Sequence, residues 1–235
     1  MPPLLRPRNS QALAAPPREA FTPAERRVIA RLTTPARVQA YLNALPYNTE
    51  PPPDPPTLRT FRGVVRTGTA HCLEAALTAA VALEQHGYPP LLMSLESIDG
   101  LDHVLFVYQQ DGRWGSVARS RDPGLHGRKP VFRSLRALAL SYVEPYIDTT
   151  GGVRAYGAVD LQVLGRYDWR LARGNVWRVS QLLYDIPHRP IRCSAARMDR
   201  LRARYFTFRR EHPGRKPVFY DRSTWSVWPR SATRY

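Results

Sequence analysis

The chain reads Ala70-His71-Cys72-Leu73-Glu74-Ala75-Ala76-Leu77 at the start of its most regular apolar segment. Small and apolar side chains then recur every three or four residues as far as position 86, and Gly87 with the prolines after it ends the pattern. This periodicity predicts a helix over residues 70–86 that glycine and proline stop. The abundance of alanine favours a central helix that a sheet approaches closely.

Cys72 falls in the first turn of this predicted helix. At a helix N-terminus, N–H groups without helical partners and the helix dipole favour the thiolate over the thiol. The thiolate is the reactive form, so its position makes Cys72 a candidate nucleophile. The alternative interpretation is a small core residue, because cysteine on an alanine-rich helix is usually buried.

Three strands are predicted after the helix. Residues 91–95 are apolar except for Ser94, as in a buried strand. Residues 103–110 and 113–120 flank Asp111-Gly112, a strong signal for a two-residue hairpin turn. The helix and these strands together predict an α+β fold in which helices pack on one face of a small antiparallel sheet, with helical extensions at both ends.

His103 opens the first hairpin strand and is the candidate base for Cys72. If the turn has no bulge, counting outward from it places His103 opposite Ser120, with their Cβ atoms about 5 Å apart. Ser120 is then the nearest candidate to orient the imidazole, and Asp122 could reach the ring if the strand bends. A third group matters because it selects the tautomer and the orientation of the base.

Other residues are weaker candidates. His71 is a rival base, but successive residues of a helix do not face each other, so we expect it to be only a flanking residue. Cys193 has no nearby base in the sequence and is expected to be inert. No CxxC, HExxH or paired histidine at ligand spacing is present, so neither a metal nor a cofactor is expected.

Two further helices are predicted to begin at Thr22-Pro23 and at Thr34-Pro35. A short helix is predicted to end at Gly68, another to cover residues 134–146, and a last one to begin near Trp177. A further strand is expected over residues 159–163. Residues 1–20 are rich in Pro, Arg and Ala and read as a loose arm. We therefore expect a core over residues 21–165, followed by a basic extension over 166–235 that packs on it.

The 235 residues carry 43% hydrophobic and 23% charged side chains, as in ordinary globular proteins. Two cysteines are too few for a disulfide framework. No signal peptide and no stretch of about 18 apolar residues is evident, so a cytoplasmic protein without a membrane association is expected.

The formal net charge is +16, which raises the question of a nucleic-acid partner. Only Lys129 and Lys216 are lysines among the 35 basic residues. This bias is typical of a GC-rich genome, the arginines are spread along the chain, and no nucleic-acid-binding motif is present. A nucleic-acid partner stays open but is not the favoured interpretation.

Several motifs resemble those of the transglutaminase-like superfamily: Ala70-His71-Cys72-Leu73-Glu74-Ala75, Gly87-Tyr88-Pro89-Pro90, Asp102-His103-Val104 and Gly112-Arg113-Trp114-Gly115. The run over residues 120–146 looks like a bacterial branch of it. The resemblance covers about residues 30–160. It implies a papain-related α+β core, in which a helix that bears the cysteine packs against an antiparallel sheet that carries His and Asp. At the position where the superfamily pattern implies the Asp of the sheet, this chain has Ala118.

The resemblance implies acyl chemistry through a thioester on Cys72, with His103 as the base. Ser120 or Asp122 would orient the base. The substrate would be a peptide, a protein or a small acyl compound. The alternative is a catalytically inactive fold of the same kind that binds a peptide or a nucleic acid through a basic groove.

Overall fold

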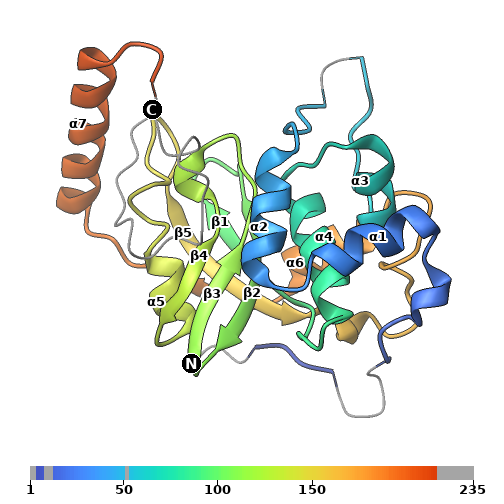
Figure 1. The fold of residues 1–235 in the computed structure, drawn as a ribbon. Coiled ribbons are helices and arrows are strands. Elements are labelled where there is room, and N and C mark those ends of the chain that lie inside the picture. The colour runs from blue at the N-terminus through green and yellow to red at the C-terminus, as the bar shows by residue number, and fades with distance from the viewer. Residues whose placement is uncertain (1–3, 8–12, 51–52, 216–235) are drawn as a thin grey trace.

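The computed structural model describes residues 4–7, 13–50 and 53–215, and its centre is an antiparallel sheet (Figure 1). The strands follow the order β4-β3-β2-β1-β5-β6 across the sheet. Their bounds are β1 Leu91–Ser97, β2 His103–Gln110, β3 Arg113–Val117, β4 Arg128–Phe132, β5 Val153–Asp160 and β6 Arg189–Pro190. Helices and an antiparallel sheet within one chain make the fold α+β, as the sequence predicts.

Most helices cover one face of this sheet (Figure 1). They are α1 Pro23–Arg31, α2 Pro35–Ala44, α3 Phe61–Thr67, α4 Cys72–Glu84 and α6 Trp177–Asp185. Their apolar side chains form one buried cluster with alternate residues of the strands, such as Leu92, Phe106 and Val159. The alanines of α4 are fully buried, so this helix is the central one.

The opposite face of the sheet is covered as well. The helix α5, Leu135–Leu140, packs there with Tyr142 and with the intervening strand residues Met93 and Leu105. The sequence predicts helices on one face of the sheet only. The structure has helices on both faces, because β1 and β2 are apolar on both faces. A strand that is apolar on both faces requires a cover on each of them.

The hairpin follows the predicted register near its turn. Asp111 and Gly112 both have positive φ, 51° and 69°, as a type I′ turn requires. Pairs run from Gln110–Arg113 to Phe106–Val117. There β3 ends, earlier than the sequence predicts.

A glutamine side chain lies where the pairing of β3 with β4 ends. The amide nitrogen of Gln39 donates to the carbonyl of Ala118 at 2.8 Å, and its oxygen accepts from the Ala118 N–H at 2.9 Å. Strand alternation turns these two groups toward β4, and the same oxygen accepts from the Gly127 N–H at 3.2 Å, so a residue of α2 takes the place of further pairing between β3 and β4.

Several elements differ from the sequence-based expectation. The predicted strand over 159–163 is the end of β5, followed by a short 3-10 helix. The predicted helix over 134–146 is confirmed only as far as Leu140, where turns take over before Pro145, because the residue before a proline disfavours the helical conformation. The strands β4 and β6 are not apparent in the sequence pattern.

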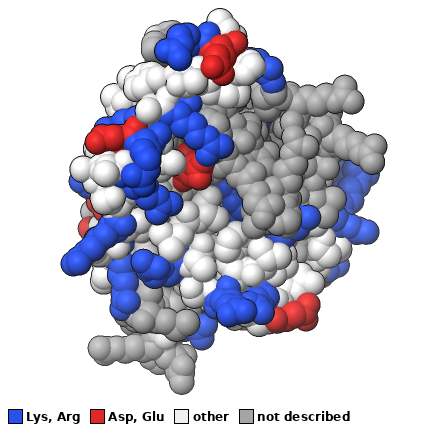
Figure 2. Space-filling model, turned by 90° about the vertical axis from the view of Figure 1, so that its left-hand side faces the viewer, with Lys and Arg blue, Asp and Glu red and all other residues white. Residues whose placement is uncertain are grey.

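The helix α7, Ala195–Glu211, is also missed by periodicity, because it buries none of its side chains. It stands at the side of the molecule (Figure 1) and carries six arginines: Arg197, Arg200, Arg202, Arg204, Arg209 and Arg210. Figure 2 views this side, where blue Lys and Arg side chains outnumber the red acidic ones.

The expected division at residues 20 and 165 stays a prediction. Val179 and Leu183 of α6 belong to the same buried cluster as α4, and Leu5 pairs with Val159. The expected arm and extension reach into residues 1–3, 8–12 and 216–235, which lie outside the described residues. In the described part of the chain, no helix has the length and apolar character needed to cross a membrane.

Candidate active site

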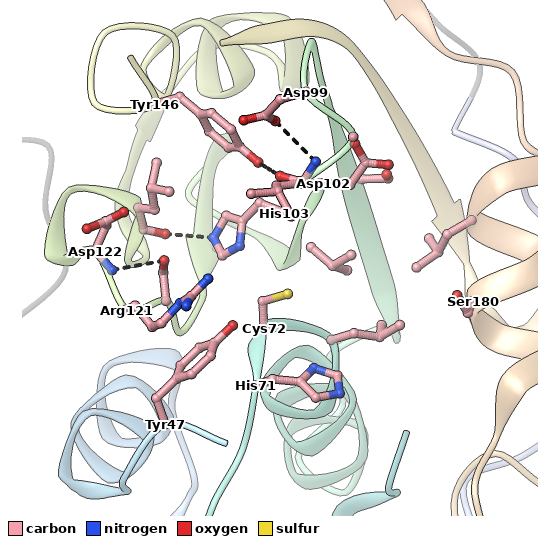
Figure 3. Close-up of a pocket in the computed structure, with 18 of the residues that line it drawn as sticks. Tyr47, His71, Cys72, Asp99, Asp102, His103, Arg121, Asp122, Tyr146 and Ser180 are labelled. Carbon is pink, nitrogen blue, oxygen red and sulfur yellow. Dashed lines mark hydrogen bonds between the residues drawn. The ribbon is translucent and has the colours of Figure 1, made fainter. Parts of the chain in front are cut away.

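A cavity of about 420 Å³ lies where the N-terminus of α4 meets the first residue of β2 (Figure 3). Cys72 and His71 line it from the helix, and His103 lines it from the sheet. Residues that precede α4, follow β3 or belong to α6 complete the wall, among them Tyr47, Ser120, Arg121, Asp122, Tyr146, Ser180 and Tyr184.

Cys72 is the first residue of α4, and His71 is its N-cap with an extended backbone. The prediction that His71 points away from Cys72 is wrong, because it assumes that both residues lie inside the helix. The helix begins one residue later, so the two side chains can converge on the cavity. The Nε2 of His71 donates to the carbonyl of Thr57 at 3.0 Å, which holds the ring beside the sulfur.

Glu74 anchors this helix start. Its carboxylate accepts from the backbone N–H of His71 at 3.1 Å and from the Nε and Nη2 of Arg59 at 2.6 and 2.8 Å. Burial raises the pKa of Glu74, but the hydrogen bonds from Arg59 and the charge of His71 lower it to about 2. The capping carboxylate therefore stays ionised and fixes the backbone just before Cys72.

The two histidines make Cys72 acidic. Burial raises the pKa of the thiol, but hydrogen bonds with His103 and His71 and the positive charge of both rings lower it to about 5. For His71 the reverse holds: burial lowers its pKa, while the hydrogen bond and the charge of Cys72, helped by Glu74, raise it to about 9. Near pH 7 the pair is therefore a thiolate beside an imidazolium.

His103 reaches the cavity from the end of the sheet. By strand alternation its side chain is on the face of Leu105, which is opposite to α4. Because His103 is the first residue of β2, its ring lies where the sheet stops and the N-terminus of α4 begins (Figure 3). Helix and histidine thus meet around the end of the sheet and not across one face.

The orienting partner of His103 is a backbone carbonyl. The Nε2 of His103 donates to the carbonyl oxygen of Leu125 at 2.8 Å. A carbonyl can only accept, so Nε2 carries the proton and Nδ1 is the nitrogen left to exchange a proton with Cys72. No sequence motif marks such a partner, because every residue carries a carbonyl.

Ser120 and Asp122 lie nearby but differ from the sequence-based picture. The hydroxyl of Ser120 accepts from the backbone N–H of Asp122 at 3.0 Å, and the observed pairing of β2 with β3 stops short of His103. The carboxylate of Asp122 points away from the ring of His103 (Figure 3). The hydroxyl of Ser120 is therefore not the group on Nε2, because β3 ends early. Any further part that either residue takes in catalysis stays a prediction.

Arg128 holds the loop that presents the Leu125 carbonyl. This fully buried arginine donates to the carbonyls of Gly124 and His126, both at 2.7 Å, on either side of Leu125. Its guanidinium also lies 4.1 Å from the ring centroid of Tyr142. One side chain thus fixes the backbone on both sides of the group that orients His103.

We expect Arg128→Met to lower the free energy of unfolding by roughly 3 kcal/mol, because it leaves the buried carbonyl of Gly124 without this donor and leaves that of His126 with Tyr142 alone. Urea denaturation measures this change. Arg133→Met is the matched control, since Arg133 is exposed in the same part of the chain and should change stability by less than about 0.5 kcal/mol. Equal effects of the two substitutions would show that the buried arginine does not hold the loop.

The second cysteine of the chain lies outside the cavity. Cys193 precedes α7, is half-buried and does not line the described pocket. In residues 4–7, 13–50 and 53–215, no group of three His, Cys, Asp or Glu side chains is placed to hold a metal ion.

No family model matches the chain, and no curated protein matches it. Among solved structures, Legionella pneumophila LapG is similar over 78% of this chain and 93% of its own, with a TM-score of 0.36 and 12% identical residues. At this distance the similarity assigns neither a family nor an activity. Membership of the transglutaminase-like superfamily stays a prediction.

Proposed function

We propose that the chain is a cysteine-dependent enzyme that hydrolyses or transfers an acyl group through a thioester on Cys72. The observation that carries the proposal is the placement of Cys72 at a helix N-terminus, between two histidines, in a cavity open to ligands. A thiol with a pKa lowered to about 5 is a thiolate near pH 7 and needs no further activation.

In the first half of the reaction, the Cys72 thiolate forms a bond to the carbonyl carbon of an amide or ester, and the carbonyl electron pair moves onto oxygen. The backbone N–H of Cys72 stabilises that oxyanion. The intermediate then reforms the carbonyl and breaks the bond to the leaving group, which takes a proton from the Nδ1 of the His103 imidazolium.

In the second half, water or an amine attacks the thioester and gives its proton to the now neutral His103. Collapse of this intermediate expels the thiolate and releases the acyl product, so that the starting state is regenerated. Water as the acceptor makes the protein a peptidase, amidase or esterase, and an amine makes it a transferase. Product analysis with and without an added primary amine distinguishes the two.

The pH dependence of thiol alkylation tests the nucleophile. In a Cys193→Ser variant, we expect the rate of reaction of Cys72 with iodoacetamide to rise through a midpoint near pH 5, since the lowered pKa keeps the thiolate above that pH and protonation removes it below. His71→Gln should move the midpoint upward, because it removes one positive charge and one hydrogen bond from the sulfur.

The alternative function is a binding module, and the arginines of α7 on the face in Figure 2 favour it. A module has no need of an activated thiol. A midpoint near that of an ordinary cysteine, at about pH 8.5, in both the Cys193→Ser parent and its His71→Gln derivative would support the module and contradict the enzyme.

A further inference from the structure

Tyr47 is a residue of the cavity that the reaction above does not use. It follows α2 and pairs in parallel with Ala70, two residues before Cys72. The neighbouring backbone secures this pairing, since the N–H of Asn48 donates to the carbonyl of Ala70 at 3.2 Å and the N–H of Ala70 donates to the carbonyl of Pro46 at 3.4 Å. The backbone of Tyr47 is therefore held in register with the start of α4.

The ring of Tyr47 is held from the other side by two arginines. The guanidinium carbons of Arg119 and Arg121 lie 5.8 and 5.9 Å from its centroid. Arg119 is itself tied down, because its Nη2 donates to the carbonyl of Leu45 at 3.0 Å. Cations at these distances are attracted to the face of an aromatic ring, so the phenol has a defined direction.

That direction is toward Cys72, as Figure 3 shows. Burial, the charge of Cys72 and a hydrogen bond with its sulfur raise the pKa of Tyr47 well above its usual range, while a hydrogen bond from the backbone N–H of Cys72 acts in the opposite sense. The hydroxyl thus lies close to both the sulfur and the N–H at the helix start. With its pKa raised, Tyr47 keeps its proton at a pH where Cys72 has lost its own, so it is available as a donor.

We propose that the hydroxyl of Tyr47 is the second donor of the oxyanion site, acting together with the backbone N–H of Cys72. The inference rests on the proposed function. As the sulfur–carbon bond forms, the carbonyl electron pair moves onto oxygen, and this oxygen accepts hydrogen bonds from the Tyr47 O–H and the Cys72 N–H. When the carbonyl reforms, both donors are released unchanged.

A donor that acts only on developing oxyanion charge has a specific kinetic signature. Acylation of the sulfur passes through an oxyanion, whereas alkylation by iodoacetamide displaces iodide at a saturated carbon and forms none. Loss of the hydroxyl should therefore slow acylation strongly, whereas alkylation loses only the hydrogen bond between the hydroxyl and the sulfur and should change little. Removing one donor of an oxyanion site lowers the rate by about 10²–10³-fold.

The test compares Tyr47→Phe with the wild-type chain in two reactions. Acylation is followed as the burst of p-nitrophenolate released from p-nitrophenyl acetate, and alkylation as the rate of iodoacetamide labelling of Cys72. We expect the burst rate of Tyr47→Phe to fall by about 10²–10³-fold, with the labelling rate within about twofold of wild type. Tyr88→Phe is the matched control, because Tyr88 follows the other end of α4 and contacts Tyr108, and it should change neither rate.

An unchanged or faster burst in Tyr47→Phe would overturn the proposal. The hydroxyl would then contribute nothing to the acylation rate, or it would hinder the approach of the substrate to the sulfur. A parallel fall of both rates would also overturn it, because it would mean that Tyr47 acts on the thiol itself. If the wild-type burst does not depend on Cys72, the proposed function fails, and the role of Tyr47 fails with it.

Discussion

Cys72→Ala should abolish acyl-transfer activity, with a loss of about 10⁴-fold or more, while the fold stays intact. The sulfur forms and breaks every covalent bond to the acyl group in the proposed reaction, and no other thiol lines the described cavity. Alanine suits the start of α4, since it is the best helix former and leaves only a small void. The burst of p-nitrophenolate measures the activity, and thermal unfolding measures the fold.

Cys193→Ala is the control for this experiment. It removes the other cysteine of the chain from a half-buried position outside the cavity. We expect its burst to equal that of wild type. A burst that persists in Cys72→Ala would refute the assignment of the nucleophile, whatever the result for Cys193→Ala.

His103→Gln should lower the rate of acylation by an amide such as p-nitroacetanilide by about 10²–10⁴-fold, because its amine leaving group needs a proton that glutamine cannot supply. Glutamine is the appropriate substitute, since its amide can still donate to the carbonyl of Leu125. The thiol should stay more acidic than an ordinary one, because His71 still supplies a hydrogen bond and a positive charge to Cys72. Acylation should therefore suffer much more than iodoacetamide labelling measured at the same pH.

The reverse pattern is expected for His71→Gln. This substitution should raise the pKa of Cys72 and leave the base in place, so that activity recovers as the pH rises. Rates of p-nitroaniline release from p-nitroacetanilide by both variants between pH 5 and 9 separate the two roles. If His103→Gln recovers with pH and His71→Gln does not, the roles of the two histidines are exchanged.

The order of elements near the site could be predicted from the sequence. The apolar periodicity of residues 70–86 and the helix-ending Gly87 and Pro89 identify α4. Asp111-Gly112 identifies the hairpin, since the turn needs positive φ at both positions. These signals are local, because helix and turn preferences depend on neighbouring residues. They were sufficient to select Cys72 and His103 as candidates, which the structure brings to one cavity.

The partners of these two residues could not be predicted in the same way. The prediction that His71 points away from Cys72 was wrong, because the helix begins only at Cys72. The pairing of β2 with β3 ends before Ser120, and the Nε2 of His103 donates to the carbonyl of Leu125. Such boundaries depend on which side chain or carbonyl takes up each backbone group, as Glu74 does for the N–H of His71, and hydropathy periodicity does not record this.

The sequence by itself determined an α+β chain with a cysteine at a helix start and a histidine at a strand start. Only the tertiary structure decided what surrounds the sulfur: a carbonyl at Leu125 that orients the base, an arginine at position 128 that holds the carbonyl, and the phenol of Tyr47. The physical reason is that every residue carries a backbone carbonyl, so the sequence does not show which carbonyl accepts the hydrogen bond from His103. Loop geometry decides which carbonyl reaches the histidine, and long-range packing and buried hydrogen bonds determine that geometry.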